Sequence, residues 1–590
     1  MDNEQLHKLR HSAEHVMHQA LKELFPQVHL AMGPATDEGF YNDFDPQSLK
    51  ITEADFPKIE KRMQELIDLN LPITRIEVSE TEARDLFKDN PYKLEWIDEF
   101  SQKGERLTVY WTGKPGEKNS MVDLCAGPHL NSTKEIGAFK LLSIAGAYWH
   151  GDEKNKMLTR IYGTAFTTKE ELEKYLQDIE NAKLYDHRKI GKELGLFVFS
   201  DLVGKGLPML GPKGAAIKRE LERFTVDEEI KRGYHHVSTP DLAKVDLYKT
   251  SGHYPYYKDT MYPVMKVDEE ELILRPMTCP HHFMFFKSEH HSYRDLPCRI
   301  GEIAHQYRYE KSGELSGLVR LRMFCLADAH IIAAKDQAKQ VIKEVLELID
   351  FANEKFGMVK GTDYRFRLSL GDRKDTKKYY KDDAAWDYAE DILRQVLKEL
   401  DAPYFEAKNE AAFYGPKIDI QVQKPGGKEE TAFTVQYDFV MPTRFELTFT
   451  NKEGKEEQPI VIHRSSIGCL ERTMAFLIEK FKGAFPVWLS PVQVRIIPIT
   501  DKQLDYAKTI ETTLKENNIR VEVDDKSETM QNKIRNAEAE HIPYMLILGG
   551  REAEAKTISL RARGEKNLGV MPTDEFLALI KADIAKKRQI

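Results

Sequence analysis

The central part of the chain contains one segment that decides its class, because residues 299–324 read RIGEIAHQYRYEKSGELSGLVRLRMF. A glycine-bearing loop in this segment separates two stretches that carry both arginines and β-forming residues. Guanidinium groups bind phosphate oxygens in a bidentate geometry, so Arg308, Arg320 or Arg322 could bind phosphates. Phe324 would then supply a flat stacking surface. For any one of these arginines alone, a surface ion pair is the more common role.

Two other segments extend this pattern. Residues 233–240, GYHHVSTP, predict the end of a helix, a turn and a strand-like stretch that leads to a proline. Residues 467–472, IGCLER, open an apolar helix with Arg472 near its start. No glycine-rich phosphate loop accompanies them, so the residues by themselves indicate a nucleotide site of low specificity.

Length and composition indicate several globular domains. The chain has 590 residues, of which 41% are hydrophobic and 31% charged, and single cores stop growing near roughly 250–300 residues. Its net charge of −9 is not that of a generally basic nucleic-acid binder. Five cysteines are too few for a disulfide framework. Without a long apolar run or an apolar leader, we expect a cytoplasmic protein that does not enter a membrane.

Three regions differ in their sequence pattern. The region before about residue 164 mixes helical and strand-like stretches, and residues 167–193 predict one long polar helix between domains. In the middle region, hairpin-like turns at residues 424–427 and 451–454 favour an antiparallel sheet. The last hundred residues alternate strand and helix patterns, which predicts a small open α/β sheet.

The first region contains a candidate site of its own. His11 and His15 lie one helical turn apart on the same face of a helix. Residues 123–129, DLCAGPH, add a thiol and a third imidazole on a Gly-Pro turn. Such residues could form a metal site or a hydrolytic pocket. From the spacing alone, a surface helix that carries two histidines without a function is the more common case.

The three central segments resemble motifs 1, 2 and 3 of class II aminoacyl-tRNA synthetases. The strings around them resemble the threonyl-tRNA synthetase family: RPMTCPHH, YRYEKSGELSGL, DAHII, FYGPKIDI and VIHRSSIG. HSAEH and DLCAGPH resemble the editing domain of that family, and PVWLSPVQV resembles the entry to its anticodon-binding domain. The resemblance runs from about residue 7 to the C-terminus.

The resemblance implies a multidomain fold with α+β and α/β parts. We expect an N-terminal α+β editing domain with a linker helix over residues 1–186. A class II catalytic core with an antiparallel sheet should follow over residues 187–487, and an α/β anticodon-binding domain over residues 488–590. The chain resembles the form of the family without an N-terminal ubiquitin-like domain. Enzymes of this class form homodimers through motif 1.

The implied activity is that of a threonine–tRNA ligase. Threonine and ATP would form threonyl-adenylate, and threonine would pass to tRNA(Thr). The family's zinc ligands fall on Cys279, His330 and His463, one Zn²⁺ per subunit, with an open position for the amino group and hydroxyl of threonine. Serine differs from threonine by one methyl group, worth roughly 1–3 kcal/mol in a pocket. Because that is too little for translation, hydrolysis of mischarged seryl-tRNA(Thr) is expected as well.

The resemblance also assigns the residues that bind ATP. Arg308 and Arg472 correspond to the arginines that hold the α- and γ-phosphates, and Arg320 should lie near the phosphates or the intermediate. Phe324 should stack on adenine while Glu310 faces the amino group of that base. Fixed guanidinium groups and Mg²⁺ suit the negative charge that gathers on the α-phosphorus during activation.

Other assignments concern threonine and its transfer. Asp328, Tyr414 and Gln436 align with residues that hold the amino acid. Lys417 could reach the carboxylate or the α-phosphate. His253 aligns with a histidine that assists transfer to the terminal ribose, a general-base role that imidazole can fill near neutral pH.

The remaining assignments lie outside the core. The editing residues are expected to be His11, His15, Asp123, Cys125 and His129, and the residues that read the anticodon Arg551, Glu552 and Arg561. In the core, four positions depart from the common pattern of the family: Leu326, Ala327, Thr431 and Cys469. None of them removes a zinc ligand or a phosphate-binding arginine.

Two other hypotheses remain open at this level. A non-catalytic RNA-binding relative would keep the fold and lose activation, but the full set of arginines and zinc ligands argues against it. A metallohydrolase centred on His11 and His15 would leave the rest of the chain unexplained.

Overall fold

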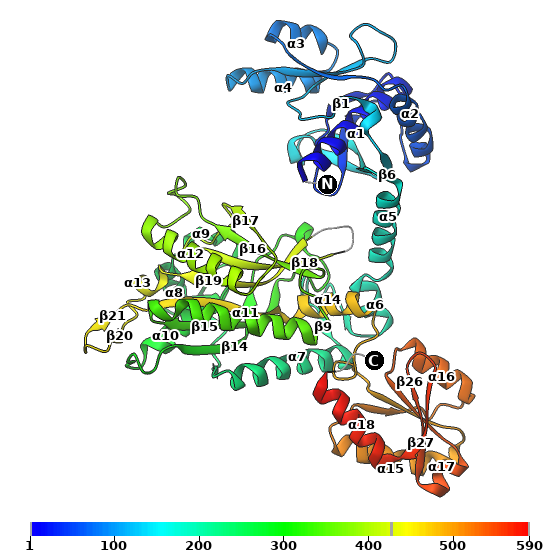
Figure 1. The fold of residues 1–590 in the computed structure, drawn as a ribbon, viewed down its shortest axis with the longest axis vertical. Coiled ribbons are helices and arrows are strands. Elements are labelled where there is room, and N and C mark those ends of the chain that lie inside the picture. Colours follow the sequence, from blue (N-terminus) through cyan, green and yellow to red (C-terminus); the bar gives the residue numbers. More distant parts are fainter. Residues whose placement is uncertain (1–2, 425–428, 588–590) are drawn as a thin grey trace. The chain divides into compact units, whose positions relative to one another are not determined.

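The computed structural model describes residues 3–424 and 429–587 (Figure 1). They fall into two compact units, one comprising the described residues up to Asn181 and the other those from Ala182 onward. The predicted multidomain architecture with α+β and α/β parts is confirmed. Within the described ranges, no helix combines the length and the apolar character that crossing a bilayer requires.

The first unit is built from two antiparallel sheets and a buried helix. The larger sheet has the strand order β1-β2-β7-β6 and the smaller one β3-β4-β5. Helix α1 (Asn3–Leu24) packs on the larger sheet because Leu9, Ala13, Val16 and Leu21 form one apolar face. The other elements of this unit are β1 (His29–Met32), β2 (Phe40–Asp45), α2 (Phe56–Asp68), β3 (Ile73–Glu77), α3 (Glu80–Leu86), α4 (Pro91–Gln102), β4 (Thr108–Thr112), β5 (Met121–Leu124), β6 (Ala138–Tyr148) and β7 (Met157–Phe166).

The expected single helix over residues 167–193 is wrong, because two helices occupy this stretch: α5 (Lys169–Leu184) and α6 (His187–Glu193). Asp186 interrupts the helix with extended backbone angles (φ −56°, ψ 130°), and its side chain accepts a hydrogen bond from the Arg188 N–H. An aspartate in this position caps a new helix. Counting helix-forming residues does not detect such a cap.

The second unit contains an eight-stranded sheet with the order β10-β14-β15-β22-β19-β18-β16-β17. The six central strands are antiparallel, as predicted, and each edge strand pairs in parallel with its neighbour. Figure 1 shows α11 lying along this sheet. The bounds of these elements are β10 (His235–His236), β14 (Cys298–Tyr307), β15 (Met323–Ala333), α11 (Ala338–Lys355), β16 (Tyr364–Leu370), β17 (Tyr404–Lys408), β18 (Lys417–Gln423), β19 (Glu429–Asp438) and β22 (Ile460–Cys469).

Helices and small sheets complete the core around the eight strands. Helix α14 (Leu470–Phe481) packs on β15 and β22 and supplies Leu470, Met474 and Leu477 to the main apolar cluster. The other elements are β8 (Phe197–Val198), β9 (Met209–Leu210), α7 (Pro212–Lys231), β11 (Leu242–Lys244), α8 (Val245–Ser251), α9 (His253–Tyr256), β12 (Met265–Val267), β13 (Glu270–Leu274), α10 (Cys279–Lys287), α12 (Asp383–Glu399), α13 (Met441–Arg444), β20 (Phe449–Thr450) and β21 (Glu456–Glu457).

The two expected hairpin turns have different outcomes. Residues 451–454 do turn between β20 and β21, but these strands form a separate two-stranded sheet. Most of the other turn, at residues 425–427, lies outside the described residues.

The last hundred residues form a five-stranded sheet with the order β24-β23-β25-β26-β27. The first three strands are parallel and the last two antiparallel, so the predicted open α/β sheet is confirmed with one extra strand, β27. Its elements are β23 (Val494–Pro498), α15 (Leu504–Glu516), β24 (Val521–Val523), α16 (Met530–Ala539), β25 (Tyr544–Leu548), α17 (Gly550–Ala555), β26 (Thr557–Ala562), β27 (Lys566–Pro572) and α18 (Thr573–Lys586).

Candidate functional site

The register of the eight-stranded sheet aligns four polar residues in one row. Lys417 of β18 is the cross-strand partner of Gln436 in β19, and Gln436 is the partner of His463 in β22. His463 in turn faces His330 of β15. Direct cross-strand partners project to the same face of a sheet, and all four side chains line one cavity of about 740 Å³. The fold thus gathers residues that are far apart in the sequence.

Cys279 joins this row from outside the sheet, at the start of α10. One ligand atom from each of Cys279, His330 and His463 lies within 4.8 Å of the others, and all three residues are buried. One thiol and two imidazoles suit zinc and leave a coordination position open. The three residues that the resemblance assigns to zinc are therefore close enough to share one ion.

The surroundings of these three residues also suit a cation. Nε2 of His463 lies 2.7 Å from Oδ2 of Asp438, the carboxylate contact that typically orients a metal-binding histidine. Burial lowers the pKa of His330 well below its ordinary value, which keeps the ring neutral as a ligand must be. Burial raises the pKa of the Cys279 thiol, an effect that a bound cation reverses.

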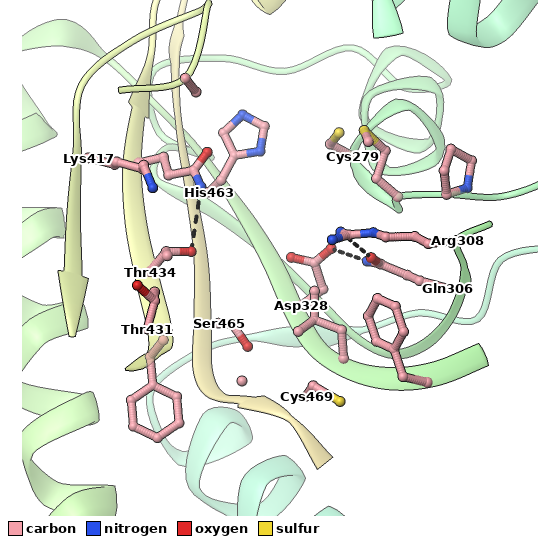
Figure 2. Close-up of a pocket in the computed structure, with 18 of the residues that line it drawn as sticks. Cys279, Gln306, Arg308, Asp328, Lys417, Thr431, Thr434, His463, Ser465 and Cys469 are labelled. Carbon is pink, nitrogen blue, oxygen red and sulfur yellow. Dashed lines mark hydrogen bonds between the residues drawn. The ribbon is translucent and has the colours of Figure 1, made fainter. Parts of the chain in front are cut away.

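Next to the row, three side chains are joined by hydrogen bonds. Figure 2 shows Arg308 donating to Gln306 (3.3 Å) and Gln306 donating to Asp328 (3.3 Å). Asp328 lies two residues before His330 on β15 and therefore shares its face. Burial raises the pKa of Asp328, because neighbouring groups compensate its charge only in part. A ligand's ammonium group would supply the missing positive charge.

The predicted phosphate-binding arginines line the same cavity. Arg308 follows directly after β14, and its guanidinium carbon lies 5.1 Å from the centre of the Phe324 ring. Burial, followed by the charge of Arg472, lowers the pKa of Arg308. Arg472 donates to the backbone oxygens of Val319 and Thr431 (3.1 and 3.2 Å). Two guanidinium groups that repel each other in one cavity attract an anion such as a polyphosphate.

From the residues alone, Arg320 and Arg322 were both candidates for binding phosphate, whereas in the structure the two side chains have different surroundings. Arg320 lines the cavity, where its Nε donates to Oε2 of Glu310 at 2.8 Å. Arg322 donates to the backbone oxygen of Glu310 and lies over the Tyr309 ring, 5.6 Å from its centre. Both arginines belong to the loop between β14 and β15 rather than to the strands.

Tyr414 and Gln436 are paired, because the Tyr414 hydroxyl donates to Oε1 of Gln436. Lys417 donates to Asp419 at 2.9 Å.

His253 also lines the cavity, and its Nδ1 lies 2.7 Å from the Ser251 hydroxyl. Burial, followed by electrostatic interaction with His463, lowers the pKa of His253 to about 3. The ring is therefore a neutral hydrogen-bonding group and a weak base.

The four positions that depart from the family pattern lie in or beside the same cavity. Leu326, Thr431 and Cys469 are part of its wall, and the backbone oxygen of Ala327 accepts a hydrogen bond from Ser465. Thr431 accepts from Gln421 (2.7 Å), and the Cys469 thiol contacts Glu471 (3.4 Å).

The first unit holds a second cluster. His11, His15, Cys125 and His129 bring one ligand atom each within 4.8 Å of one another. Sγ of Cys125 lies 3.4 Å from Nε2 of His11 and 3.3 Å from Nε2 of His129. Gly127 has φ 74° and packs against Tyr110, where a Cβ would come within 2.2 Å of the hydroxyl. Only glycine fits this turn, which returns the chain to α1.

Burial keeps this second cluster neutral while a charged pair lies beside it. Burial lowers the pKa of His11 to about 4, lowers those of His15 and His129 well below their ordinary value, and raises that of Cys125 to about 12. Asp123 lies 2.6 Å from the ammonium nitrogen of Lys93 and 3.0 Å from Nδ1 of His18. Although burial opposes it, these partners lower the pKa of Asp123.

The anticodon candidates lie on the surface of the C-terminal sheet and its helices. Arg551 and Glu552 belong to α17, where Oε2 of Glu552 accepts from the Gly549 N–H at 2.9 Å. Arg561 belongs to β26, opposite Met545 of β25. These contacts give no independent evidence of RNA binding.

Several residues of the two sites were missed at the level of the sequence. Gln306 precedes Arg308 by two positions, so strand periodicity could have placed both on one face. His18 continues the helical face of His11 and His15. No sequence signal marks Lys93 or Asp438.

Sequence comparisons match all three parts of the chain. Residues 262–481 match the family described as tRNA synthetase class II core domain (G, H, P, S and T). Residues 493–583 match an anticodon binding domain, and residues 108–162 match the threonyl and alanyl tRNA synthetase second additional domain.

Whole-chain relatives are similar along nearly the full sequence. A threonine–tRNA ligase from Geobacillus kaustophilus is 50% identical over 588 residues, which cover 99% of this chain and 88% of that protein. A threonine–tRNA ligase from Streptococcus gordonii is 49% identical over 584 residues, covering 99% and 89%. Among solved structures, the RNA binding domain of threonyl-tRNA synthetase from Cryptosporidium parvum has a TM-score of 0.64 and 33% identity, covering 67% of this chain and 98% of that one.

Proposed function

The chain belongs to the family of threonine–tRNA ligases, class II aminoacyl-tRNA synthetases, and we propose that its central cavity is where threonine and ATP react. Its substrates are an amino acid, ATP and tRNA, and its second additional domain supports hydrolysis of mischarged tRNA. One observation supports the assignment of the cavity: the cross-strand row from Lys417 to His330 lines the same cavity as Arg308 and Arg472.

For the amino acid, we propose that Cys279, His330 and His463 hold one Zn²⁺ per subunit. Their donor types and separations fit the ion. When bound, zinc would supply a Lewis-acidic position for the amino group and side-chain hydroxyl of threonine, which valine cannot satisfy. Asp328 would neutralise the ammonium group, and Tyr414 with Gln436 would close the side of the pocket.

For ATP, the proposal assigns the two arginines to the phosphates. Arg308 would hold the α-phosphate and Arg472 the γ-phosphate, and Mg²⁺ bound with ATP would supply further positive charge. Phe324 would stack on adenine, Glu310 would accept from its amino group, and Arg320 would lie near the phosphates.

In the first step, a carboxylate oxygen of threonine attacks the α-phosphorus, and the bond to pyrophosphate breaks. Negative charge gathers on the phosphoryl oxygens, where the fixed charges of Arg308 and Lys417 stabilise it. In the second step, a ribose hydroxyl of tRNA(Thr) attacks the carbonyl carbon and AMP leaves. His253, which is neutral, would accept a hydrogen bond from that hydroxyl and orient it.

We propose that the second cluster is the editing site, and that its substrate is seryl-tRNA(Thr). His11, His15, Cys125 and His129 would hold and activate the hydrolytic water, since neutral imidazoles accept its proton. Asp123, whose Oδ2 lies 3.9 Å from Nε2 of His15, would orient that imidazole. The four donors are also of the types that bind zinc. Hydrolysis would yield serine and free tRNA.

The remaining parts of the proposal concern assembly and location. We propose domain boundaries at residues 1–186, 187–487 and 488–590, and anticodon contacts by Arg551, Glu552 and Arg561. The segment at residues 233–240 would lie at the two-fold interface of a homodimer. A cytoplasmic location follows from the substrates, which are those of translation.

A pair of cysteine variants tests the zinc assignment. Cys279→Ser should lower zinc content from about one ion per chain and abolish threonine-dependent ATP–pyrophosphate exchange. Cys298→Ser is the matched control, because Cys298 is half-buried at the start of β14 and is not part of the cavity wall. Equal zinc content and exchange in both variants would contradict the proposal.

A further inference from the structure

A buried chain of hydrogen bonds leads from His330 away from the cavity. Nδ1 of His330 lies 2.8 Å from Nδ1 of His282 in α10, and Nε2 of His282 lies 3.2 Å from Oε2 of Glu302 in β14. His282 is 0% exposed and Glu302 4% exposed, and neither lines the cavity. Neither residue has a part in the chemistry described above.

We propose that His282 and Glu302 are positioning residues that fix the tautomer and the orientation of His330, so that its Nε2 presents a lone pair to the bound zinc. The inference rests on the proposed zinc site. It goes beyond that site by assigning a function to two residues that contact neither the ion nor a substrate.

The direction of the protons follows from the carboxylate at the end of the chain. Although burial opposes it, hydrogen bonds from His282 and Thr239 lower the pKa of Glu302 to about 2, so Glu302 only accepts. Nε2 of His282 must therefore donate, and with this imidazole in its neutral form Nδ1 is left as the acceptor. Nδ1 of His330 then donates to it, and the free lone pair of His330 is on Nε2. This is the tautomer that a ligand bound through Nε2 requires.

Glu302 is itself held rigidly. Its Oε2 accepts from the Thr239 hydroxyl at 2.7 Å, and its Oε1 accepts from the Thr239 N–H at 3.1 Å and from Arg275 at 3.2 Å. Arg275 also donates to the backbone oxygen of His305 at 2.6 Å. With donors on both oxygens, the carboxylate cannot rotate, so the two imidazoles beyond it are oriented as well.

The two zinc-binding histidines thus reach carboxylates by different routes. His463 contacts Asp438 directly, whereas His330 reaches Glu302 through one intervening imidazole. Carboxylate partners of this kind change metal affinity by roughly 10–100-fold when they are removed. A role in folding alone would leave zinc affinity unchanged in any variant that still folds.

The test measures zinc affinity in the full-length protein by competition with a chromophoric chelator. We expect His282→Leu, which removes the acceptor, to weaken zinc binding by roughly 10–100-fold. His282→Gln keeps an acceptor oxygen and should recover part of that loss. Glu302→Gln keeps the shape of the side chain, removes its charge and should weaken zinc binding by about ten-fold. In Co²⁺-loaded protein, His282→Leu and Glu302→Gln should shift the visible absorption bands of the site.

His281→Gln is the matched control, because His281 is the adjacent histidine of α10 and lies near the Tyr248 ring at 6.4 Å. It should bind zinc as the unmodified protein does. Circular dichroism and urea unfolding identify variants that fail to fold. Glu302→Gln is isosteric and is therefore the variant expected to disturb folding least. Among folded variants, zinc affinities for His282→Leu and Glu302→Gln within about two-fold of the unmodified protein would overturn the inference.

The same data separate this inference from the proposal on which it rests. If the unmodified protein binds zinc and Cys279→Ser does not, the zinc site stands whatever the His282 and Glu302 variants do. If Cys279→Ser binds zinc as tightly as the unmodified protein, the site and the inference both fail.

Discussion

His330 and His463 face each other as direct cross-strand partners in β15 and β22, with ring centres 4.7 Å apart and ring planes at 86°. The backbone hydrogen bonds of the sheet hold the two strands in this register, so the pair is set by the fold and does not need an ion to bring it together. The register of the sheet alone therefore positions the two imidazoles to share one ion.

Removal of metal should therefore abolish activity while leaving the fold intact. After dialysis against a chelator, we expect unchanged far-ultraviolet circular dichroism and loss of threonine-dependent pyrophosphate exchange. A modest fall in the melting temperature should accompany this, because an ion bound only to the folded state stabilises it. Readdition of Zn²⁺ should restore exchange. Loss of secondary structure on chelation would contradict a preformed site.

Editing should be separable from activation. Cys125→Ala and His129→Ala remove groups that flank the proposed hydrolytic water, and we expect seryl-tRNA(Thr) hydrolysis to fall by about 10²–10⁴-fold. Threonine-dependent pyrophosphate exchange should remain unchanged, because these residues belong to the first unit. Deacylation of purified seryl-tRNA(Thr) measures the effect. His150→Gln, a change at a half-exposed histidine paired with Glu95, is the control. Full hydrolysis by both cluster variants would rule out this site.

Arg308→Ala should impair adenylate formation far more than folding. Loss of one fixed charge at the developing phosphoryl charge costs about 10²–10³-fold in kcat. The repulsion between Arg308 and Arg472 disappears in this variant, so stability should not fall sharply. Pyrophosphate exchange at saturating threonine gives the rate. Arg299→Lys, a change at an arginine that pairs with Glu344 at 2.6 Å, should retain normal exchange. Normal kcat in Arg308→Ala would exclude the phosphate role.

Acid should destabilise the core partly through His253. Its folded pKa of about 3 lies below the ordinary value of about 6.5, so the unfolded state binds more protons between these two values. This stability is fully present above pH 6.5 and is lost as the pH falls towards 3. Between pH 7.5 and 5 the loss is about 2 kcal/mol.

Urea unfolding of the unmodified protein and His253→Gln at both pH values isolates this contribution. The unmodified protein should lose about 2 kcal/mol more than the variant on acidification. Equal losses would mean that the imidazole is not buried in its neutral form. The transfer step should likewise show no titration of His253 between pH 6 and 8.

Much of the architecture was accessible from the sequence, because it depends on local patterns. The alternation of apolar residues after Val494 predicted the C-terminal α/β sheet, although β27, with Gly569 in its middle, was missed. The helix break at Asp186 was missed because helix propensity alone does not distinguish an aspartate that caps a new helix from one on a helix surface. Local periodicity indicates whether a helix or a strand forms, but it is less informative about where that helix or strand is interrupted.

The two sites were accessible only in part. Family strings identified Cys279, His330 and His463, but their proximity depends on the pairing of β15 with β22 and on where α10 begins. Register between strands distant in sequence is set by the whole sheet and leaves no local signal. His282 and Glu302 were missed for the same reason, since their contact exists only after α10 packs beside β14.

ATP–pyrophosphate exchange with threonine, serine and valine as separate substrates tests the central claim most directly. The account predicts strong exchange with threonine, weaker exchange with serine, which keeps the hydroxyl, and almost none with valine, which lacks it. Zinc-replete protein that exchanges with none of the three, or that accepts valine as readily as threonine, would contradict the account.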